Sequence, residues 1–183
     1  MRVYCDTGIF VDYLSARGPV SASLRTLARR GRSPANLARD AEKLLQTCLA
    51  KHVAGTSTLT FYEVEESVFK VLSRTMTGVT LAHSLLIPVA RSAALQFDMA
   101  TRLFGVQVLD LTQPRAQYAL SNHALNMHAI RAADALHIST AVEFEADILV
   151  TGDAQVIALD RLIPNRLGLP MRVCDTDLAL TLL

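Results

Sequence analysis

The sequence has no tryptophan, and aromatic residues make up only 5% of the chain. Stacking of nucleic-acid bases on aromatic side chains is therefore limited, so any binding of nucleic acid has to rely on backbone contacts and on shape. The net charge is +1, which excludes a strong overall field for attracting nucleic acid or an anionic membrane. Such binding would need a local charged patch.

Cysteine is also scarce: Cys5, Cys48 and Cys174 lie far apart and form no Cys-x-x-Cys motif. This argues against a disulfide framework or a zinc site and favours a reducing, cytoplasmic location. The longest apolar stretches, such as residues 85–90, are far shorter than the roughly 20 residues of a membrane span. The N-terminal MRVYCDTGIF does not resemble a signal peptide, because a strand-like run starts at once.

What the sequence does contain is a large apolar fraction, 51% of 183 residues, enough for one domain with a substantial core. Apolar strands are expected at 2–5, 53–58, 106–111, 147–153 and 171–175. Helices are expected at 9–16, 20–31, 33–52, 61–74, about 81–104, 113–127 and 130–146. Near-continuous apolar strands that alternate with helices indicate a parallel sheet covered on both faces.

Several helix boundaries carry local signals. Ser33 can cap the helix whose first turn holds Pro34. Gly31 is expected to end the preceding helix, and Gly78 interrupts the pattern before the long apolar one. Pro88 is expected to kink or split that long helix.

Acidic residues stand at four places where a strand meets a helix. Asp6 directly follows the first strand and Asp153 follows another by a tight glycine turn, so both should lie at one edge of a parallel sheet. Glu63 and Asp134 fall in the first turns of two helices. Four carboxylates at one edge would repel each other unless a cation intervened. A hard divalent cation such as Mg²⁺ takes oxygen ligands of this kind.

Each acid also has a purely structural interpretation. Asp6 could cap the helix that follows it. Glu63 could belong to a capping box that starts three residues earlier. Asp134 could pair with Arg131 on the same helical face, and Asp153 could be an ordinary turn residue. The specific signal is the ordered set, with each member at the correct end of its element.

Three segments resemble the PIN-domain family, in particular the VapC-like ribonuclease toxins of prokaryotic toxin–antitoxin pairs. They are VYCDTGIFVDYL (3–14), TSTLTFYEVEESV (56–68) and IRAADALHISTAVEFEADILVTGD (130–153). The third is the most specific. The resemblance does not cover residues 16–52 or about 76–126 in detail.

The resemblance implies a three-layer α/β/α fold with a five-stranded parallel sheet in the order 3-2-1-4-5 and extra helices. It implies one domain over residues 1–183, with helical insertions at about 17–52 and 76–104. Many family members carry a further acid one or two positions after the last aspartate, where this sequence has Ala154 and Gln155.

The resemblance also implies a metal-dependent endoribonuclease with an acidic pocket for Mg²⁺ or Mn²⁺. The pocket would consist of Asp6, Glu63, Asp134 and Asp153, and Thr151 could help to bind metal or water. The expected partners are an RNA substrate, a cognate antitoxin protein and a second copy of the chain. A housekeeping nuclease of the same fold, or an RNA- or protein-binding module with little activity, is the alternative.

Three further features have two interpretations each. Residues 17–51 hold eight basic residues against two acidic ones, which could grip a phosphate backbone or form a solvated helix face. His137 shares the helical face of Asp134 and could assist proton transfer or be a structural histidine. The apolar stretch 81–100 could be core or a partner surface.

Two other phosphate-handling folds fit the sequence less well. A haloacid-dehalogenase-like phosphatase needs Asp-x-Asp after its first strand, whereas this chain has Asp6, Thr7 and Gly8. A receiver-like signalling domain needs an acidic pair there and a lysine late in the chain. The last lysine of this chain is Lys70.

Overall fold

A five-stranded parallel sheet forms the centre of the protein, for which a computed structural model describes residues 1–17, 28–75 and 82–183. The strands are β1 (Arg2–Cys5), β2 (Val53–Ser57), β3 (Gln107–Leu109), β4 (Ile148–Val150) and β5 (Arg172–Cys174). Their order across the sheet is β3-β2-β1-β4-β5, and each neighbouring pair is parallel. The predicted fold class and strand order are confirmed.

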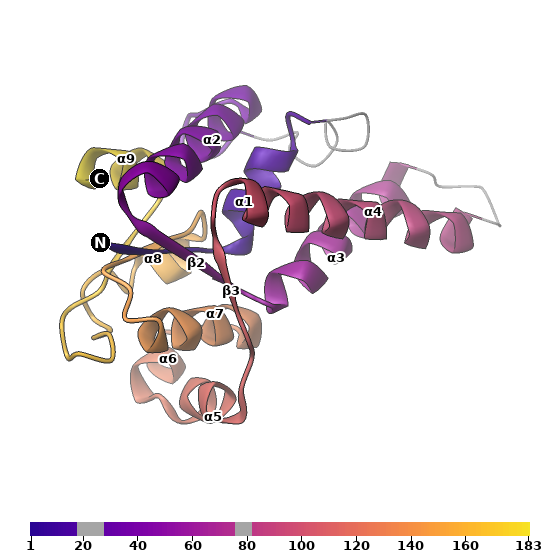
Figure 1. Ribbon diagram of the computed structural model, residues 1–183. Helices are drawn as coiled ribbons and strands as arrows, with labels where there is room; N and C mark the ends of the chain where they lie inside the picture. The colour runs from indigo at the N-terminus through magenta and orange to yellow at the C-terminus, as the bar shows by residue number, and fades with distance from the viewer. Residues whose placement is uncertain (18–27, 76–81) are drawn as a thin grey trace.

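Helices cover both faces of this sheet (Figure 1). In chain order they are α1 (Thr7–Leu14), α2 (Pro34–Lys51), α3 (Leu59–Thr75), α4 (Ala82–Leu103), α5 (Gln113–Ser121), α6 (His123–Met127), α7 (Ala132–Glu143), α8 (Ala154–Ile157) and α9 (Thr176–Leu182). Side chains of α1, α2, α3, α4 and α9 share one core cluster, and those of α5, α6, α7 and α8 share the other.

The central strand β1 shows why the two cores form. Val3 and Cys5 belong to the first cluster and Tyr4 to the second, because successive side chains of a strand point to opposite faces. All three side chains are fully buried. Cys5 is therefore a core residue.

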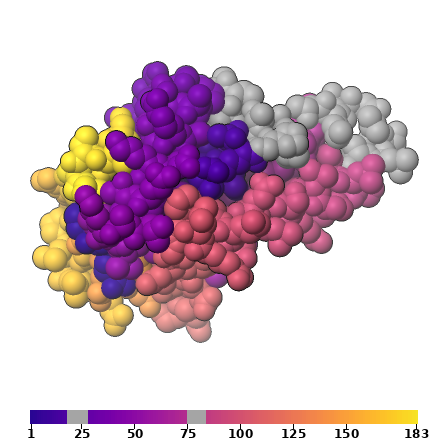
Figure 2. Space-filling model, turned by 45° about the horizontal axis from the view of Figure 1, so that its top comes forward, coloured from indigo at the N-terminus to yellow at the C-terminus, as the bar shows by residue number. Residues whose placement is uncertain are grey.

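The helices α3 and α4 lie side by side and extend beyond the sheet (Figure 1). In the space-filling view, this part of the chain projects from the body of the molecule (Figure 2). Phe97 of α4 joins them to the core, since its ring packs edge-on against Phe10 at 4.8 Å and Phe61 at 4.6 Å between centroids. The helix α4 continues through Pro88, so of the expected kink or split, the split is wrong. The stretch 81–100 supplies both core and surface, because Leu86 is buried and Leu95 is exposed.

Some predicted boundaries differ in the structure. The helix expected at 113–127 is two helices, α5 and α6, because Asn122 interrupts it and accepts a hydrogen bond from Leu125 N at 3.1 Å as the new N-cap. Ser33 caps α2 as expected, accepting from Asn36 N at 3.3 Å.

Most of the helix expected at 20–31 lies outside the described residues, which resume at residue 28. From there the chain forms a tight turn in which Arg29 and Arg32 exchange backbone hydrogen bonds. Gly31 has a φ of +76°, the left-handed conformation that glycine adopts without strain. The helix does not extend to Gly31. The turn instead directs the chain into α2.

Candidate active site

Asp6 joins the end of β1 to the start of α1. Its Oδ1 accepts a hydrogen bond from Thr7 N at 2.7 Å, so the side chain caps α1. Its Oδ2 accepts from the hydroxyl of Thr151, which follows β4, at 2.6 Å. The capping interpretation is correct, but it does not exclude a second role. The same carboxylate faces the edge of the sheet where β1 and β4 end.

Glu63 projects from the first turns of α3 toward the same edge. Its Oε2 accepts hydrogen bonds from the Thr7 hydroxyl and from His137 Nε2, the latter at 2.8 Å. At the start of α3, the backbone N–H of Leu59 donates a hydrogen bond to the Ser57 hydroxyl at 3.1 Å. The capping-box interpretation of Glu63 is therefore wrong, because its carboxylate bonds to other elements.

The other two acids, Asp134 and Asp153, lie at the starts of α7 and α8. Asp134 lies in the first turn of α7. Among the described residues Asp134 forms no ion pair with Arg131. The interpretation of Asp134 as half of a local ion pair is therefore wrong. Asp153 is the N-cap of α8 and accepts from Gln155 N at 2.7 Å. Like Asp6, it combines a local capping role with a position at the edge of the sheet.

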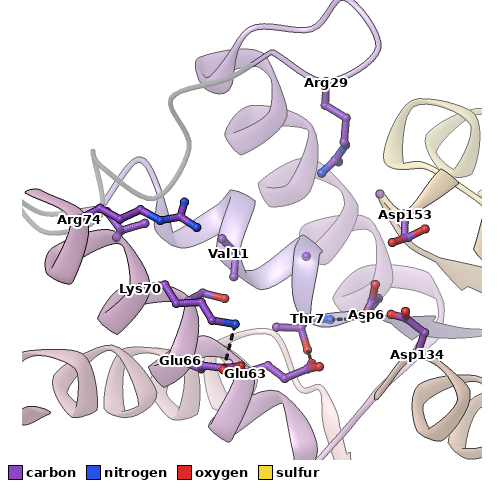
Figure 3. A pocket seen from close by; sticks show the side chains of 14 residues that line it. Asp6, Thr7, Val11, Arg29, Glu63, Glu66, Lys70, Arg74, Asp134 and Asp153 are labelled. Atoms are coloured by element: carbon purple, nitrogen blue, oxygen red, sulfur yellow. Dashed lines mark hydrogen bonds and ion pairs between the residues drawn. The ribbon is translucent and has the colours of Figure 1, made fainter. Parts of the chain in front are cut away.

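All four predicted acids line one open pocket of about 510 Å³ (Figure 3). They reach it from four separate elements or element junctions, at the edge where parallel strands end. Asp6 and Asp134 lie near one another in Figure 3, with Asp153 on the same side and Glu63 toward the other. Their assignment as metal ligands and catalytic residues stays a prediction.

His137 connects the acidic pocket to the core. It is 3% exposed, its Nδ1 lies 2.8 Å from the Tyr4 hydroxyl, and its Nε2 lies 3.7 Å from Asp6 Oδ1. One potential ligand atom from each of Asp6, Glu63 and His137 lies within 4.8 Å of the other two. Two carboxylates and an imidazole are donors that suit a divalent cation. The structural interpretation of His137 is supported, because it is buried and hydrogen-bonded on both ring nitrogens.

The pKa values reflect this crowding of charge. Burial raises the pKa of Asp134, and the nearby Asp6 and Asp153 raise it further, to about 6. Burial also acts to raise the pKa of Glu63, but the hydrogen bond and charge of His137 outweigh it and leave that pKa lowered. Burial acts to lower the pKa of His137, yet Glu63 and Asp6 raise it overall.

Replacing Asp134 with asparagine should stabilise the metal-free protein at neutral pH. Because the pKa of Asp134 is raised on folding, its contribution to stability is fully present below the unfolded pKa, near 4, and is lost as pH rises through about 6. Asparagine stays neutral throughout. In EDTA we expect a melting temperature on the order of 2 °C above wild type at pH 7.5. A gain at pH 5.0 as large as at pH 7.5 would contradict this cause.

A buried ion-pair network borders the pocket, and its acidic half was not predicted from the sequence. Arg29 and Arg32, from the turn before α2, both pair with Asp175 at the end of β5. Arg29 also pairs with Asp12 of α1 at 2.7 Å. Neither acid is exposed. Two residues of the basic segment are thus ion-paired inside the protein, and the solvated-face interpretation does not hold for them.

A sequence signal for Asp175 did exist. The segment RVCD (172–175) repeats the pattern of RVYCD (2–6), an apolar strand followed at once by aspartate. Tyr4 and Thr7, which complete the hydrogen bonds around His137 and Glu63, had no comparable signal. Their role depends on which side chains meet across the sheet.

Two cations line the pocket on the side away from Arg29. Lys70 and Arg74 follow Glu63 along α3 by about two and three turns (Figure 3). Lys70 pairs with Glu66 at 2.9 Å and is largely exposed. The pocket therefore has Asp6, Asp134 and Asp153 toward one end and the positive side chains of Lys70 and Arg74 toward the other (Figure 3).

No protein-family model and no curated protein matches the sequence. Among solved structures, the chain is similar to one in the crystal structure of VapBC2 from Rickettsia felis bound to a DNA fragment from their promoter. The similarity has a TM-score of 0.52 and 14% sequence identity, and it covers 94% of this chain and 97% of that chain. The protein has a PIN-like fold. At this identity the comparison establishes the architecture.

Within the PIN-like fold, the acidic pocket lies at the edge of the sheet where β1 and β4 end. Asp6 directly follows β1, and Thr151 directly follows β4. The described residues contain no helix long and apolar enough to cross a membrane.

Proposed function

We propose that the protein is a metal-dependent endoribonuclease that hydrolyses RNA phosphodiester bonds. The observation that carries the proposal is the meeting of Asp6, Glu63, Asp134 and Asp153 in one pocket of a PIN-like fold. Helix capping accounts for Asp6 and Asp153 individually but not for the meeting of four acids, since burial and the nearby carboxylates raise the pKa of Asp134. The pocket has a volume of about 510 Å³.

The donor set fits a divalent cation. Asp6 and Glu63 would hold Mg²⁺ or Mn²⁺, with Asp134 and Asp153 nearby to bind it directly or through water. When bound, such a cation lowers the pKa of water and offsets the negative charge of a phosphodiester. His137 and the Thr7 hydroxyl both donate to Glu63 Oε2, and Thr151 donates to Asp6 Oδ2. These bonds fix the orientation of the two carboxylates before substrate arrives.

The reaction needs no nucleophilic side chain. Cys5 is fully buried, so the proposed nucleophile is water, which attacks phosphorus in line with the departing oxygen. The bond from phosphorus to the 3′-oxygen breaks, leaving a 5′-phosphate and a 3′-hydroxyl end. The four carboxylates supply the negative surroundings that hold the cation. The side chains of Arg29, Lys70 and Arg74, which also line the pocket, supply positive charge that attracts the RNA backbone.

We further propose that the protein is the toxin of a toxin–antitoxin pair and forms a homodimer. The structurally similar chain comes from a VapBC2 complex bound to promoter DNA. The helix α4 exposes large apolar side chains that a partner could cover, namely Leu85, Ile87, Leu95, Met99 and Leu103. Between α4 and α1, a groove of about 670 Å³ is lined by Tyr13, Met99 and Leu103 together with Arg17 and Arg102. A small reading frame upstream that encodes an antitoxin would support this assignment.

The test of the proposed function is cleavage of RNA by the purified protein. We expect single-stranded RNA to be cut in Mg²⁺ or Mn²⁺, to survive in EDTA, and to be cut again when the cation is restored. The new ends should carry 5′-phosphates, measured by end-labelling before and after phosphatase treatment. Cleavage at an unchanged rate in EDTA, or products with 2′,3′-cyclic phosphates, would overturn the proposal.

A further inference from the structure

Arg29 is held at the pocket by two buried carboxylates. Its Nη2 donates to Asp12 Oδ2 at 2.7 Å and to Asp175 Oδ1 at 2.9 Å, and its Nε donates to Asp175 Oδ2 at 3.2 Å. The Arg29 side chain is only 17% exposed. An arginine fixed in this way loses little conformational freedom when it binds a further group.

The other terminal nitrogen of Arg29, Nη1, lies against Gly152, which stands between Thr151 and Asp153. A Cβ atom on Gly152 would lie 2.4 Å from Nη1, so only glycine permits this approach. The φ of Gly152 is not positive, and the backbone conformation itself does not demand glycine. Contact with Arg29 is thus the physical reason for glycine at this position.

Arg29 stands beside the acids without neutralising them. It lines the same pocket, and Figure 3 shows its side chain reaching toward the end where Asp6, Asp134 and Asp153 lie. Within residues 1–17, 28–75 and 82–183, Arg29 forms no ion pair with any of these three, and Nη1 donates no hydrogen bond. The pocket therefore holds a fixed cation with a donor still available.

We propose that Arg29 is a substrate-binding residue that donates from Nη1 to a non-bridging oxygen of the phosphodiester in the pocket. This inference rests on the nuclease function proposed above and assigns it a phosphate contact. A phosphodiester that enters a pocket of four carboxylates meets repulsion, which a fixed guanidinium next to Asp153 offsets. The charge-assisted hydrogen bond from arginine to phosphate is among the stronger polar contacts in proteins.

Arg32 provides a matched control for this role. It shares Asp175 with Arg29 and also donates to Thr176 Oγ1 at 2.7 Å, but it does not line the pocket. Arg29→Gln and Arg32→Gln should therefore both weaken the ion-pair network. Only Arg29→Gln should weaken the binding of RNA.

The experiment measures binding of a fluorescein-labelled, 12-nucleotide single-stranded RNA by anisotropy, in Ca²⁺ at 50 to 300 mM NaCl. For Arg29→Gln we expect a roughly 10- to 100-fold higher Kd at the lowest salt. The slope of log K against log salt should fall in magnitude by about 0.7, the value for one lost contact to a single strand. Arg32→Gln should keep the wild-type slope. The affinity for Mn²⁺, measured by calorimetry, should not fall in either variant, because neither substitution removes a carboxylate that lines the pocket.

Gly152→Ala tests the same contact with every ion-pairing residue intact. Its Cβ would lie 2.4 Å from Nη1, 2.5 Å from Cζ and 2.8 Å from Nε of Arg29, so the guanidinium has to shift. RNA should therefore bind more weakly, while the melting temperature should fall no further than in Arg29→Gln. This variant keeps the test decisive if Arg29→Gln does not fold.

The outcomes separate this inference from the proposed function. If wild type cleaves RNA, and Arg29→Gln and Gly152→Ala bind it with the wild-type Kd and slope, the phosphate contact is overturned while the nuclease stands. If wild type binds RNA but never cleaves it, the nuclease proposal falls and the slope still decides the role of Arg29. Failure of wild type to bind RNA overturns both.

Discussion

Asp6→Asn should reduce metal-dependent RNA cleavage by at least about 10³-fold while leaving the fold intact. Asparagine keeps the oxygen that accepts from Thr7 N, so the N-cap of α1 remains. Its amide nitrogen would face Thr151, whose hydroxyl can rotate from donor to acceptor. What disappears is the negative charge at the centre of the donor set formed with Glu63 and His137. The loss should therefore appear in catalysis and in metal affinity.

The measurement compares initial cleavage rates in Mn²⁺ with thermal unfolding of the same samples. Asp98→Asn is a suitable control, because Asp98 lies on α4, pairs only with Arg102 in the described part of the chain, and does not line the pocket. It should cleave like wild type. Asp6→Asn protein that melts like wild type and retains more than a tenth of its rate would remove Asp6 from the mechanism.

Asp175→Ala should be among the most destabilising single substitutions in the protein, costing about 3–5 kcal/mol of unfolding free energy. The carboxylate is fully buried, and Arg29 and Arg32 both pair with it. Burial acts to raise the pKa of Asp175, but the hydrogen bond from Arg32 and the charge of Arg29 outweigh burial and leave the pKa lowered. Alanine would leave two guanidinium groups without their shared partner. The turn that sets Arg29 at the pocket would also lose its anchor to β5.

Urea denaturation of Asp175→Ala and Asp177→Ala tests this account. Asp177 is two residues away but 45% exposed, and its contacts with Arg30 and Arg32 are both 3.9 Å long. An exposed pair of this kind contributes about 0–1 kcal/mol. Equal, small losses in the two variants would show that the buried network contributes little to stability.

The sequence was sufficient for the sheet and for the acids that end its strands. Asp6 and Asp153 could be placed together because the carboxyl ends of parallel strands share one edge, whatever the loops do. Glu63 and Asp134 could be placed near that edge because each lies in the first turns of its helix. These placements use the pattern of strands and helices, whereas the strand order 3-2-1-4-5 was implied by the resemblance to the PIN-domain family.

The sequence did not predict contacts that depend on how elements pack. The link from Tyr4 through His137 to Glu63 joins β1, α7 and α3, and no spacing within the chain encodes it. Likewise, Arg29 was assigned to a helix from its apolar neighbours, whereas its pairing with Asp12 and Asp175 belongs to a turn. The local sequence pattern predicts each helix or strand. Which side chains of different elements come into contact depends on how the elements pack in the tertiary fold.

The most direct test is an anomalous diffraction measurement on crystals grown with Mn²⁺. The account predicts a manganese peak in the acidic pocket, with carboxylate oxygens of Asp6 and Glu63 at about 2 Å and with Asp134 and Asp153 bound directly or through water. A well-ordered pocket without such a peak at millimolar Mn²⁺, or a peak held by residues elsewhere, would contradict it.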